Sequence, residues 1–98
     1  MGFRVVITRP AVDDLAEIVR FISRDNAAAG ERTGFRLVEA AESLGELPLR
    51  GRIVPERKHR DCREVILKPY RIVYRVKEEE KLVEVLRFLA WRTRNAGN

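Results

Sequence analysis

The stretch Arg63-Glu64-Val65-Ile66-Leu67-Lys68-Pro69-Tyr70-Arg71-Ile72-Val73-Tyr74-Arg75 contains the pattern that decides the fold. After the proline, aromatic and β-branched residues alternate with basic ones, which is typical of a strand with one buried face. Because proline lacks a backbone donor, the Lys68-Pro69 pair indicates a turn rather than the middle of a strand. We therefore predict a β-hairpin with strands at 62–67 and 70–77, one face of which is buried and the other basic.

The residues before this hairpin predict one strand and two helices. Positions 3–8 are apolar and β-branched, which favours a first strand. A helix is expected over 10–23, because its apolar residues recur at helical spacing and leave Asp14 on the solvent side. A second helix is expected over 26–47, capped by the side chain of its first residue and ended by the proline that follows it. Leu47 belongs to the apolar stripe of this second helix.

The remaining segments predict a long loop and a last strand. Residues 49–61 show no periodicity and contain turn-forming residues, so we expect a surface loop. The segment from 82 to about 92 is apolar on both faces, as expected of a central strand. The sequence therefore predicts an α+β fold with the element order β-α-α-β-β-β. An antiparallel four-stranded sheet packs against an α-helical hairpin, in a single domain over residues 1–98.

The positive charge of the chain is concentrated in one quarter of the sequence. Between Arg50 and Arg75 there are nine Lys or Arg residues against three acidic ones, a net charge of +6, whereas the whole chain carries +5. Concentrated like charge destabilises a folded domain through self-repulsion. Such a surface is therefore typical of a protein that binds an anionic partner.

The composition excludes several classes of protein. No run approaches the roughly 20 apolar residues that span a bilayer, and the N-terminal residues lack the features of a secretory signal, so we expect a cytoplasmic protein. Cys62 and His59 are the only residues of their types, so one chain can form neither a disulfide nor a Cys/His metal cluster. We expect no metal and no cofactor, and we expect Cys62 to be a small packed residue.

Five motifs occur in order along the chain. They are Ala11-x-x-Asp14-Leu15-x-x-Ile18-x-x-Phe21-Ile22, Leu47-Pro48, Gly51-Arg52-x-x-Pro55-Glu56, Arg63-Glu64 and Tyr70-Arg71-Ile72-Val73-Tyr74. Together with the element order, they resemble the RelE/ParE toxin superfamily of bacterial type II toxin–antitoxin modules, and its ParE branch over nearly the whole chain. The resemblance implies a toxin that arrests growth and a cognate antitoxin whose C-terminal segment wraps around it.

The superfamily contains two activities, ribosome-dependent mRNA cleavage in RelE-like toxins and poisoning of DNA gyrase in ParE-like toxins. RNA cleavage needs a general base, a general acid and cations that stabilise the phosphorane. For this alternative the resemblance supplies Arg63 and Arg92 as cations, and His59 is the one imidazole. The Tyr, or His-Tyr pair, that follows the last strand in ribonuclease relatives is absent from residues 91–98. Because arginine is a poor general base, the gyrase hypothesis is favoured and no catalytic residue is assigned.

A gyrase poison acts by binding, so its surface matters more than any pKa. We expect the target-binding surface to combine the basic loop, the strand arginines and the end of the chain. Its candidate residues are Arg52, Arg57, Lys58, Arg60, Arg63, Arg71, Trp91, Arg92 and Arg94. Trp and Arg are frequent anchors of protein interfaces. Two of these residues have a structural alternative, because Trp91 can pack on the core and Arg63 can form an ion pair with Glu64 or with an acidic residue of a neighbouring strand.

The antitoxin is expected on apolar surface that the helices leave uncovered. Two helices cannot cover both faces of a four-stranded sheet, so a partner's helix and strand can fill a groove or extend the sheet. The candidate residues for this contact are Leu15, Val19, Arg71 and Arg75. A non-catalytic nucleic-acid-binding module is a further alternative, supported by charge but not by the aromatic side chains that single-strand binders use for stacking.

Overall fold

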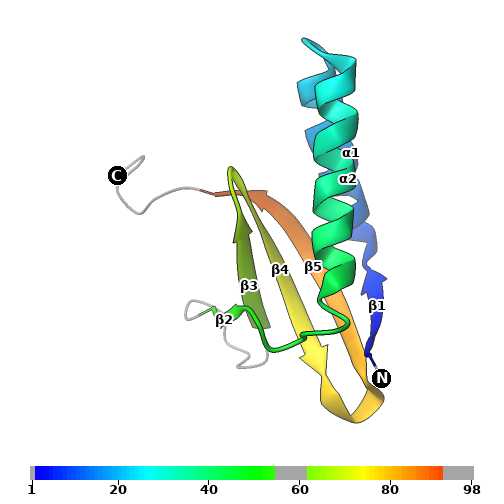
Figure 1. Ribbon diagram of the computed structural model, residues 1–98, viewed down its shortest axis with the longest axis vertical. Helices are drawn as coiled ribbons and strands as arrows, with labels where there is room; N and C mark the ends of the chain where they lie inside the picture. The colour runs from blue at the N-terminus through cyan, green and yellow to red at the C-terminus, as the bar shows by residue number, and fades with distance from the viewer. Residues whose placement is uncertain (1, 55–61, 92–98) are drawn as a thin grey trace.

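The computed structural model describes residues 2–54 and 62–91, and it has the predicted order of elements with one short strand added. Figure 1 shows a long helical hairpin beside a twisted sheet. The elements are β1 (Arg4–Ile7), α1 (Arg9–Ser23), α2 (Ala27–Ser43), β2 (Arg52–Ile53), β3 (Cys62–Leu67), β4 (Tyr70–Lys77), the 3-10 turn η1 (Glu78–Glu80) and β5 (Leu82–Ala90). The hairpin β3–β4 has the predicted bounds, because its alternating pattern and its turn agree with each other.

The sheet confirms the α+β class but differs from the prediction in two details. Its strand order is β1-β5-β4-β3-β2, with β1 parallel to β5 and the other pairs antiparallel. The expected all-antiparallel arrangement is therefore wrong for β1. The fifth strand, β2, lies within the segment expected to be loop and pairs Arg52 with Glu64. A strand of two residues is too short to leave any periodicity in the sequence, which is why it was missed.

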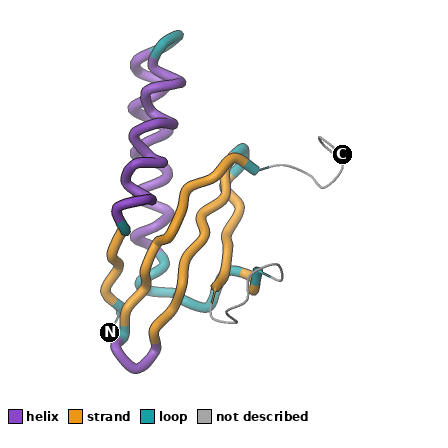
Figure 2. The backbone as a smooth tube through the Cα atoms, turned by 180° about the vertical axis from the view of Figure 1, so that it is seen from behind, coloured by secondary structure: helices purple, strands orange, loops and turns teal. Residues whose placement is uncertain are grey.

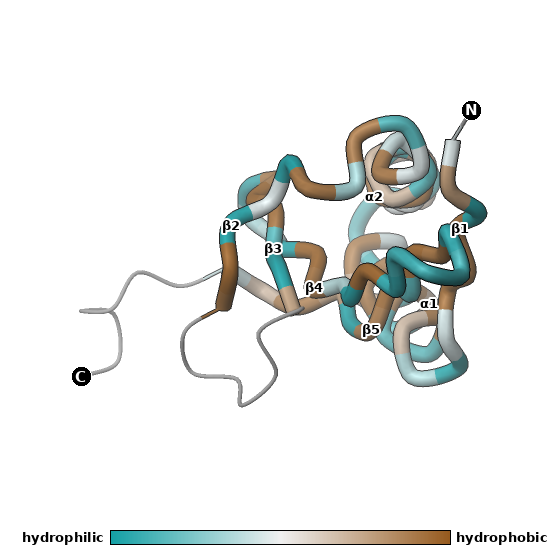
Figure 3. Tube along the Cα trace, turned by 90° about the horizontal axis from the view of Figure 1, so that it is seen from below, coloured by the Kyte–Doolittle hydropathy of each residue, from teal (hydrophilic) through white to brown (hydrophobic). Residues whose placement is uncertain are grey.

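Both helices pack on the same face of the sheet and form the core with it. The core residues are Ala11, Leu37, Ala41 and Leu44 from the helices and Ile72, Tyr74, Val76, Val83, Val85 and Phe88 from the sheet. Figure 2 shows that the helical hairpin extends beyond the end of the sheet, so its far end has no strand beneath it. In the view from below, the helices lie over the β1 and β5 side, whereas β2 and β3 lie away from them (Figure 3).

The second helix begins where predicted but ends earlier. The Asn26 side chain accepts a hydrogen bond from the Ala29 N–H at 3.0 Å, which confirms the cap. The helix ends at Ser43 because the next residues dock on the residue that precedes β1: the Phe3 N–H donates to the Gly45 carbonyl at 2.8 Å. A Cβ at Gly45 would lie 2.6 Å from the Phe3 oxygen, so this contact requires glycine. Leu47 is consequently 60% exposed, and its expected place in the helix stripe is wrong.

Asp14 is paired, although the sequence pattern placed it on the solvent side. Its carboxylate accepts from the Arg87 guanidinium at 2.6 and 2.9 Å and from the Phe88 N–H at 3.1 Å. Because β1 pairs only with residues 82–85, the rest of the outer edge of β5 is open, and α1 lies along it. The Asp14 carboxylate raises the pKa of Arg87 through this hydrogen bond. Asp14 therefore ties α1 to the uncovered edge of the sheet.

The structure also places Cys62 and Trp91, and it shows the character of the two helices. Cys62 is 2% exposed, which confirms that it is a small packed residue. Trp91 directly follows β5 and is half-buried. Its backbone N–H donates to the Pro69 carbonyl at 2.7 Å. Neither of the helices in the described ranges combines the length and the apolar character that a membrane span requires.

Candidate functional site

The face of the sheet that points away from the helices is rich in basic side chains, and we call it the open face. Residues directly opposite each other in neighbouring strands share a face, and Glu64 lies opposite both Arg52 and Val73. Arg71, Arg75 and Lys77 alternate with the core residues of β4 and therefore belong to this face. The predicted basic face of the hairpin is thus present.

At the centre of the open face, one buried carboxylate holds two arginines from different strands. The Glu64 side chain is 1% exposed and accepts from Arg71 at 2.7 Å through one oxygen and from Arg52 at 2.6 Å through the other. Burial alone raises the pKa of Glu64, but hydrogen bonds and charge from Arg71 and Arg52 outweigh burial and lower it. Glu64 is therefore a carboxylate at neutral pH, and it links β2, β3 and β4 through one charge cluster.

Three other basic side chains of the sheet are paired with carboxylates as well. Arg75 donates to Glu84 at 3.0 Å, and the Lys77 ammonium lies 3.8 Å from the same carboxylate. Together with the Asp14–Arg87 pair, these contacts give each strand carboxylate a cationic partner. Five basic side chains (Arg52, Arg71, Arg75, Lys77, Arg87) thus share the three carboxylates of Glu64, Glu84 and Asp14, and these clusters keep an excess of positive charge.

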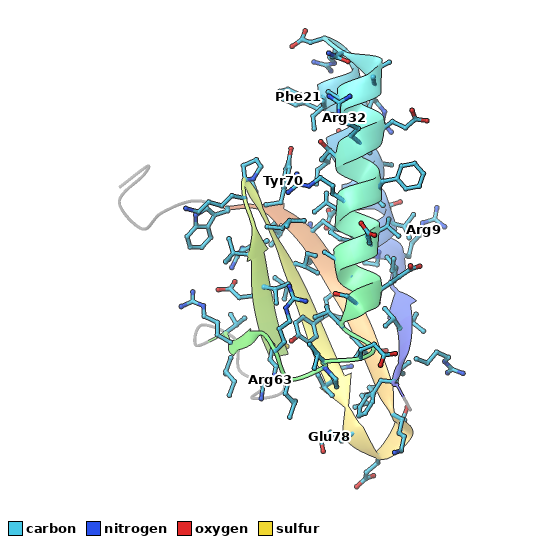
Figure 4. All side chains as sticks on the ribbon, in the orientation of Figure 1. Arg9, Phe21, Arg32, Arg63, Tyr70 and Glu78 are labelled. Atoms are coloured by element: carbon cyan, nitrogen blue, oxygen red, sulfur yellow. The ribbon has the colours of Figure 1, made fainter. Side chains whose placement is uncertain are left out.

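Arg63 does not belong to the open face. It lies opposite Tyr74 and shares the helix-side face with Val65 and Leu67, which pack against the core. Its guanidinium donates to the Gly51 carbonyl at 2.8 Å and to the Leu49 carbonyl at 3.3 Å (Figure 4). The proposed ion pair between Arg63 and Glu64 is therefore wrong, because adjacent strand residues point to opposite faces. Arg63 instead fixes the backbone of the turn that precedes β2.

Tyr74 fixes the same turn from inside the core. Its side chain is fully buried, its hydroxyl donates to the Pro48 carbonyl at 2.8 Å, and it accepts from the Gly51 N–H at 2.8 Å. Burial raises the pKa of Tyr74, so the hydroxyl stays protonated near neutral pH. We call residues 47–51 the clamped turn, because Tyr74 and Arg63 together bind three of its carbonyl groups.

A second candidate surface lies where the helical hairpin extends past the sheet. A hollow of about 340 Å³ is lined by Glu17, Ile18, Arg20, Phe21, Arg24, Tyr70 and Ala90. We call it the tip groove, and Figure 4 places Phe21 on the hairpin above Tyr70 at the end of the sheet. Phe21 is 67% exposed, and the Arg24 guanidinium lies 5.8 Å from the centre of its ring. An exposed aromatic side chain beside a mostly apolar hollow is typical of a docking site.

The structure brings together only part of the candidate set. Arg52, Arg71 and Arg75 share the open face, whereas Arg63 lies on the other side of the sheet. Leu15 packs against the core, and Val19 lies against Gly34 of α2, where an added Cβ would meet its methyl group at 3.0 Å. Five candidates of the basic loop and the chain end, together with His59, lie outside the described residues: Arg57, Lys58, Arg60, Arg92 and Arg94.

The sequence reasoning missed the central role of Glu64. A two-residue turn at Lys68-Pro69 pairs Leu67 with Tyr70, and this register places Glu64 across from Val73, two residues from Arg71. Counting outward from the turn could therefore have found the Glu64–Arg71 pair. No three His, Cys, Asp or Glu side chains of residues 2–54 and 62–91 are grouped so as to hold a metal ion.

Comparison with solved structures gives close matches to the fold. A chain of the RelBE2 toxin–antitoxin complex from Mycobacterium tuberculosis is 25% identical, with a TM-score of 0.72 over 92% of this chain and 99% of that one. A chain of the chromosomal ParDE system from P. aeruginosa is 21% identical, with a TM-score of 0.76 over 93% and 98%. The isolated E. coli RelE toxin is 18% identical, with a TM-score of 0.61 over 97% and 90%.

Comparison at the level of sequence gives the family. No curated protein matches the chain. The model of the ParE toxin of the type II toxin–antitoxin system parDE matches residues 5–92, which include all the helices and strands described above except the first residue of β1. This chain therefore belongs to the ParE toxin family, and it is a type II toxin of the ParE/RelE superfamily.

Proposed function

We propose that this toxin arrests growth by binding DNA gyrase and stabilising the cleaved-DNA state, and that a cognate antitoxin neutralises it. The observation that carries the proposal is the charge cluster of the open face, where the Glu64 carboxylate binds Arg52 and Arg71. Because the Glu64 carboxylate already binds both arginines, its negative charge repels a second anion, such as a scissile phosphate, that would bind the same guanidinium groups. The face is better suited to hold the sheet rigid than to cleave RNA.

The ionisable groups of this face support docking rather than proton transfer. General acid–base catalysis needs a group whose pKa lies near the working pH and whose proton is free to move. In the described part of the open face, the carboxylates Glu64 and Glu84 each accept hydrogen bonds from arginine, and the pKa of Glu64 is lowered further from neutrality. The buried Tyr74 hydroxyl has a raised pKa and is occupied by the clamped turn.

The gyrase proposal is tested with protein purified from its antitoxin complex. We expect expression without antitoxin to stop growth, and the purified toxin to inhibit supercoiling and to accumulate gyrase-cleaved DNA. Translated mRNA should remain intact in the same preparation. Codon-spaced cleavage of ribosome-bound mRNA would reverse the assignment in favour of the RelE-like activity, and a normally growing culture would contradict both.

Two changes should reduce toxicity without loss of antitoxin binding. Deletion of residues 91–98 removes Trp91 and two arginines of the candidate target surface. Arg63→Ala removes the guanidinium that binds the Leu49 and Gly51 carbonyls, so we expect it to act through the clamped turn. Growth assays and co-purification with the antitoxin measure the two properties separately. Arg32→Ala, an exposed arginine on α2, is the matched control and should leave both unchanged (Figure 4).

We propose that the antitoxin docks in the tip groove with an amphipathic segment that carries acidic residues. The groove is mostly apolar, and its charged rim contains Arg20 and Arg24 against Glu17. Arg20 is already paired with Glu17, which leaves Arg24 beside the exposed ring of Phe21. An apolar anchor next to a cation favours a partner with an apolar face and a nearby carboxylate.

Phe21 should therefore be an anchor of the antitoxin contact. We expect Phe21→Ser to weaken antitoxin binding by about 2 kcal/mol, roughly thirtyfold, because buried aromatic anchors contribute energies of this size. Phe35→Ser is the matched control, since Phe35 is 72% exposed and does not line the tip groove. Titration calorimetry on refolded toxin measures both variants. Equal effects of the two substitutions would place the antitoxin elsewhere.

A further inference from the structure

The end of the molecule opposite the tip groove carries a surface that lies apart from both the tip groove and the charge cluster of the open face. Two hollows of about 550 and 400 Å³ meet there, since Leu49 and Glu78 line both of them. One wall is the clamped turn with Leu47, Leu49 and Arg50, and the other is the acidic turn Glu78–Glu80. We call these residues the base surface, and Figure 3 views the molecule from this end.

The base surface exposes apolar side chains on a rigid backbone. Leu47 is 60% exposed and Leu49 is 53% exposed, although neighbouring backbone groups of the same turn are bound by the core residue Tyr74 and by Arg63. Arg50 adds a hydrogen bond to the Ser43 hydroxyl at 3.2 Å. A fixed turn loses little conformational entropy on binding, so its leucines are suited to anchor an interface.

Arg50 and the acidic turn Glu78–Glu80 face the two hollows without ion-pair partners in the described part of the chain. None of the ion pairs formed by residues 2–54 and 62–91 includes Arg50 or any of Glu78–Glu80. Arg50 lies on the leucine wall and Glu78–Glu80 form the opposite wall. Glu46 also lines the smaller hollow, and Arg63 and Lys77 also line the larger one. This arrangement contrasts with the open face, where the strand carboxylates are bound by arginine or lysine.

We propose that the base surface binds a second copy of this chain, in a two-fold symmetric dimer. A two-fold contact joins the same patch of both subunits. Each contact between two different residues of the patch therefore occurs twice, once in each direction. Two chains of net charge +5 repel each other, and a contact through a locally acidic patch lowers this repulsion. The symmetry brings Leu47 and Leu49 of both copies together and sets each Arg50 against the Glu78–Glu80 turn of the other.

The dimer does not depend on the proposed function. The base surface shares no residue with the tip groove, and the open-face cluster of Arg52, Glu64 and Arg71 is also outside it. A dimer of this kind therefore leaves the tip groove and the open-face cluster of both copies accessible, whereas the candidate target residue Arg63 lines one of the two hollows. Failure of the gyrase assay would not affect this proposal, and a monomeric toxin would not affect the gyrase proposal.

Sedimentation equilibrium of the full-length, refolded toxin tests the dimer. We expect a reversible increase from 11.4 kDa to twice this mass as the concentration rises. Leu47→Ser with Leu49→Ser should weaken the dimer at least about tenfold, because it removes the apolar centre. Phe35→Ser, which changes an exposed apolar residue outside the base surface, should leave the dimer unchanged. Circular dichroism confirms that each variant is folded.

A charge-swap experiment separates this contact from unspecific association. Arg50→Glu alone and Glu79→Arg alone should each be monomeric. In a dimer of either variant, residue 50 of each copy would face a residue 79 of the same charge on the other copy, and this repulsive pair would occur twice. A mixture of the two variants should form a heterodimer, because both of its contacts then join opposite charges. A wild-type toxin that stays monomeric, or a dimer that survives the leucine substitutions, overturns the proposal. So does a mixture in which the two variants fail to associate.

Discussion

Replacement of both arginines that bind Glu64, in an Arg52→Ala and Arg71→Ala double variant, will destabilise the fold by about 3–5 kcal/mol. The carboxylate is 1% exposed and accepts from both guanidinium groups, so their loss leaves a buried anion without a counterion. Urea unfolding followed by circular dichroism measures the change. Each single variant should lose less free energy of unfolding than the double variant, because one arginine still binds the carboxylate.

A third substitution shows whether the effect comes from the buried charge. Adding Glu64→Gln to the double variant removes the anion and keeps the shape, so most of the lost stability should return. An equally unstable triple variant would show that the arginines act through packing of their stems instead. Arg9→Ala is the control for loss of a basic residue, because its pair with Asp13 is exposed on both sides.

The contribution of Glu64 to the pH dependence of stability should have opposite signs in the wild type and in the Arg52→Ala and Arg71→Ala double variant. In the wild type the pKa of Glu64 is lowered, so its contribution is present above the ordinary value of 4.5 and is lost as the pH falls through the folded-state pKa. In the double variant only burial remains, which raises the pKa of Glu64 in the folded state. The double variant should therefore gain stability relative to the wild type as the pH is lowered toward 4.5. A parallel loss in both proteins would contradict the assignment.

The second large effect is expected at Gly51, in the clamped turn. A Cβ at this position would lie 2.6 Å from the Glu64 carbonyl oxygen and 2.7 Å from the Tyr74 hydroxyl. Neither can move away, since the carbonyl belongs to β3 and the hydroxyl is held by the Pro48 carbonyl. We expect Gly51→Ala to destabilise the protein by about 3 kcal/mol, the upper range for insertion of one methyl group into a tight site.

Another glycine provides the matched control for this prediction. At Gly34 in α2, an added Cβ would meet only the Val19 methyl group at 3.0 Å, and alanine also gains helix propensity of about 1 kcal/mol. Gly34→Ala should therefore change the free energy of unfolding much less than Gly51→Ala. Chemical denaturation of both variants measures the difference, and similar losses would show that the clamped turn is not tightly held.

Several elements were predictable because local signals agreed with each other. The hairpin β3–β4 has alternating apolar residues on both sides of a proline turn, and its observed bounds are those expected. The cap of α2 at Asn26 follows from the side-chain chemistry of one residue. The last strand was expected to be central because both of its faces are apolar, and β5 lies between β1 and β4.

The candidate site was less predictable than the fold. A basic face on the hairpin follows from period-two alternation, so Arg71 and Arg75 could be placed on it from the sequence. Arg63 was grouped with them although it lies on the other face, because its role depends on the carbonyl groups of a turn twelve residues away. Arg52 reaches Glu64 only because two residues of an apparent loop join the sheet edge.

The amino-acid order by itself determined the α+β class, the hairpin, the helix pair and the basic face, because each depends on periodicity or on a single capping or turn residue. Only the tertiary structure decided that β1 lies parallel to β5, that α2 stops at Ser43, and that Glu64, rather than solvent, binds the arginines. These features result from contacts between segments far apart in the chain. Local propensity carries no information about which distant hydrogen-bonding groups will satisfy a buried carboxylate or an unpaired strand edge.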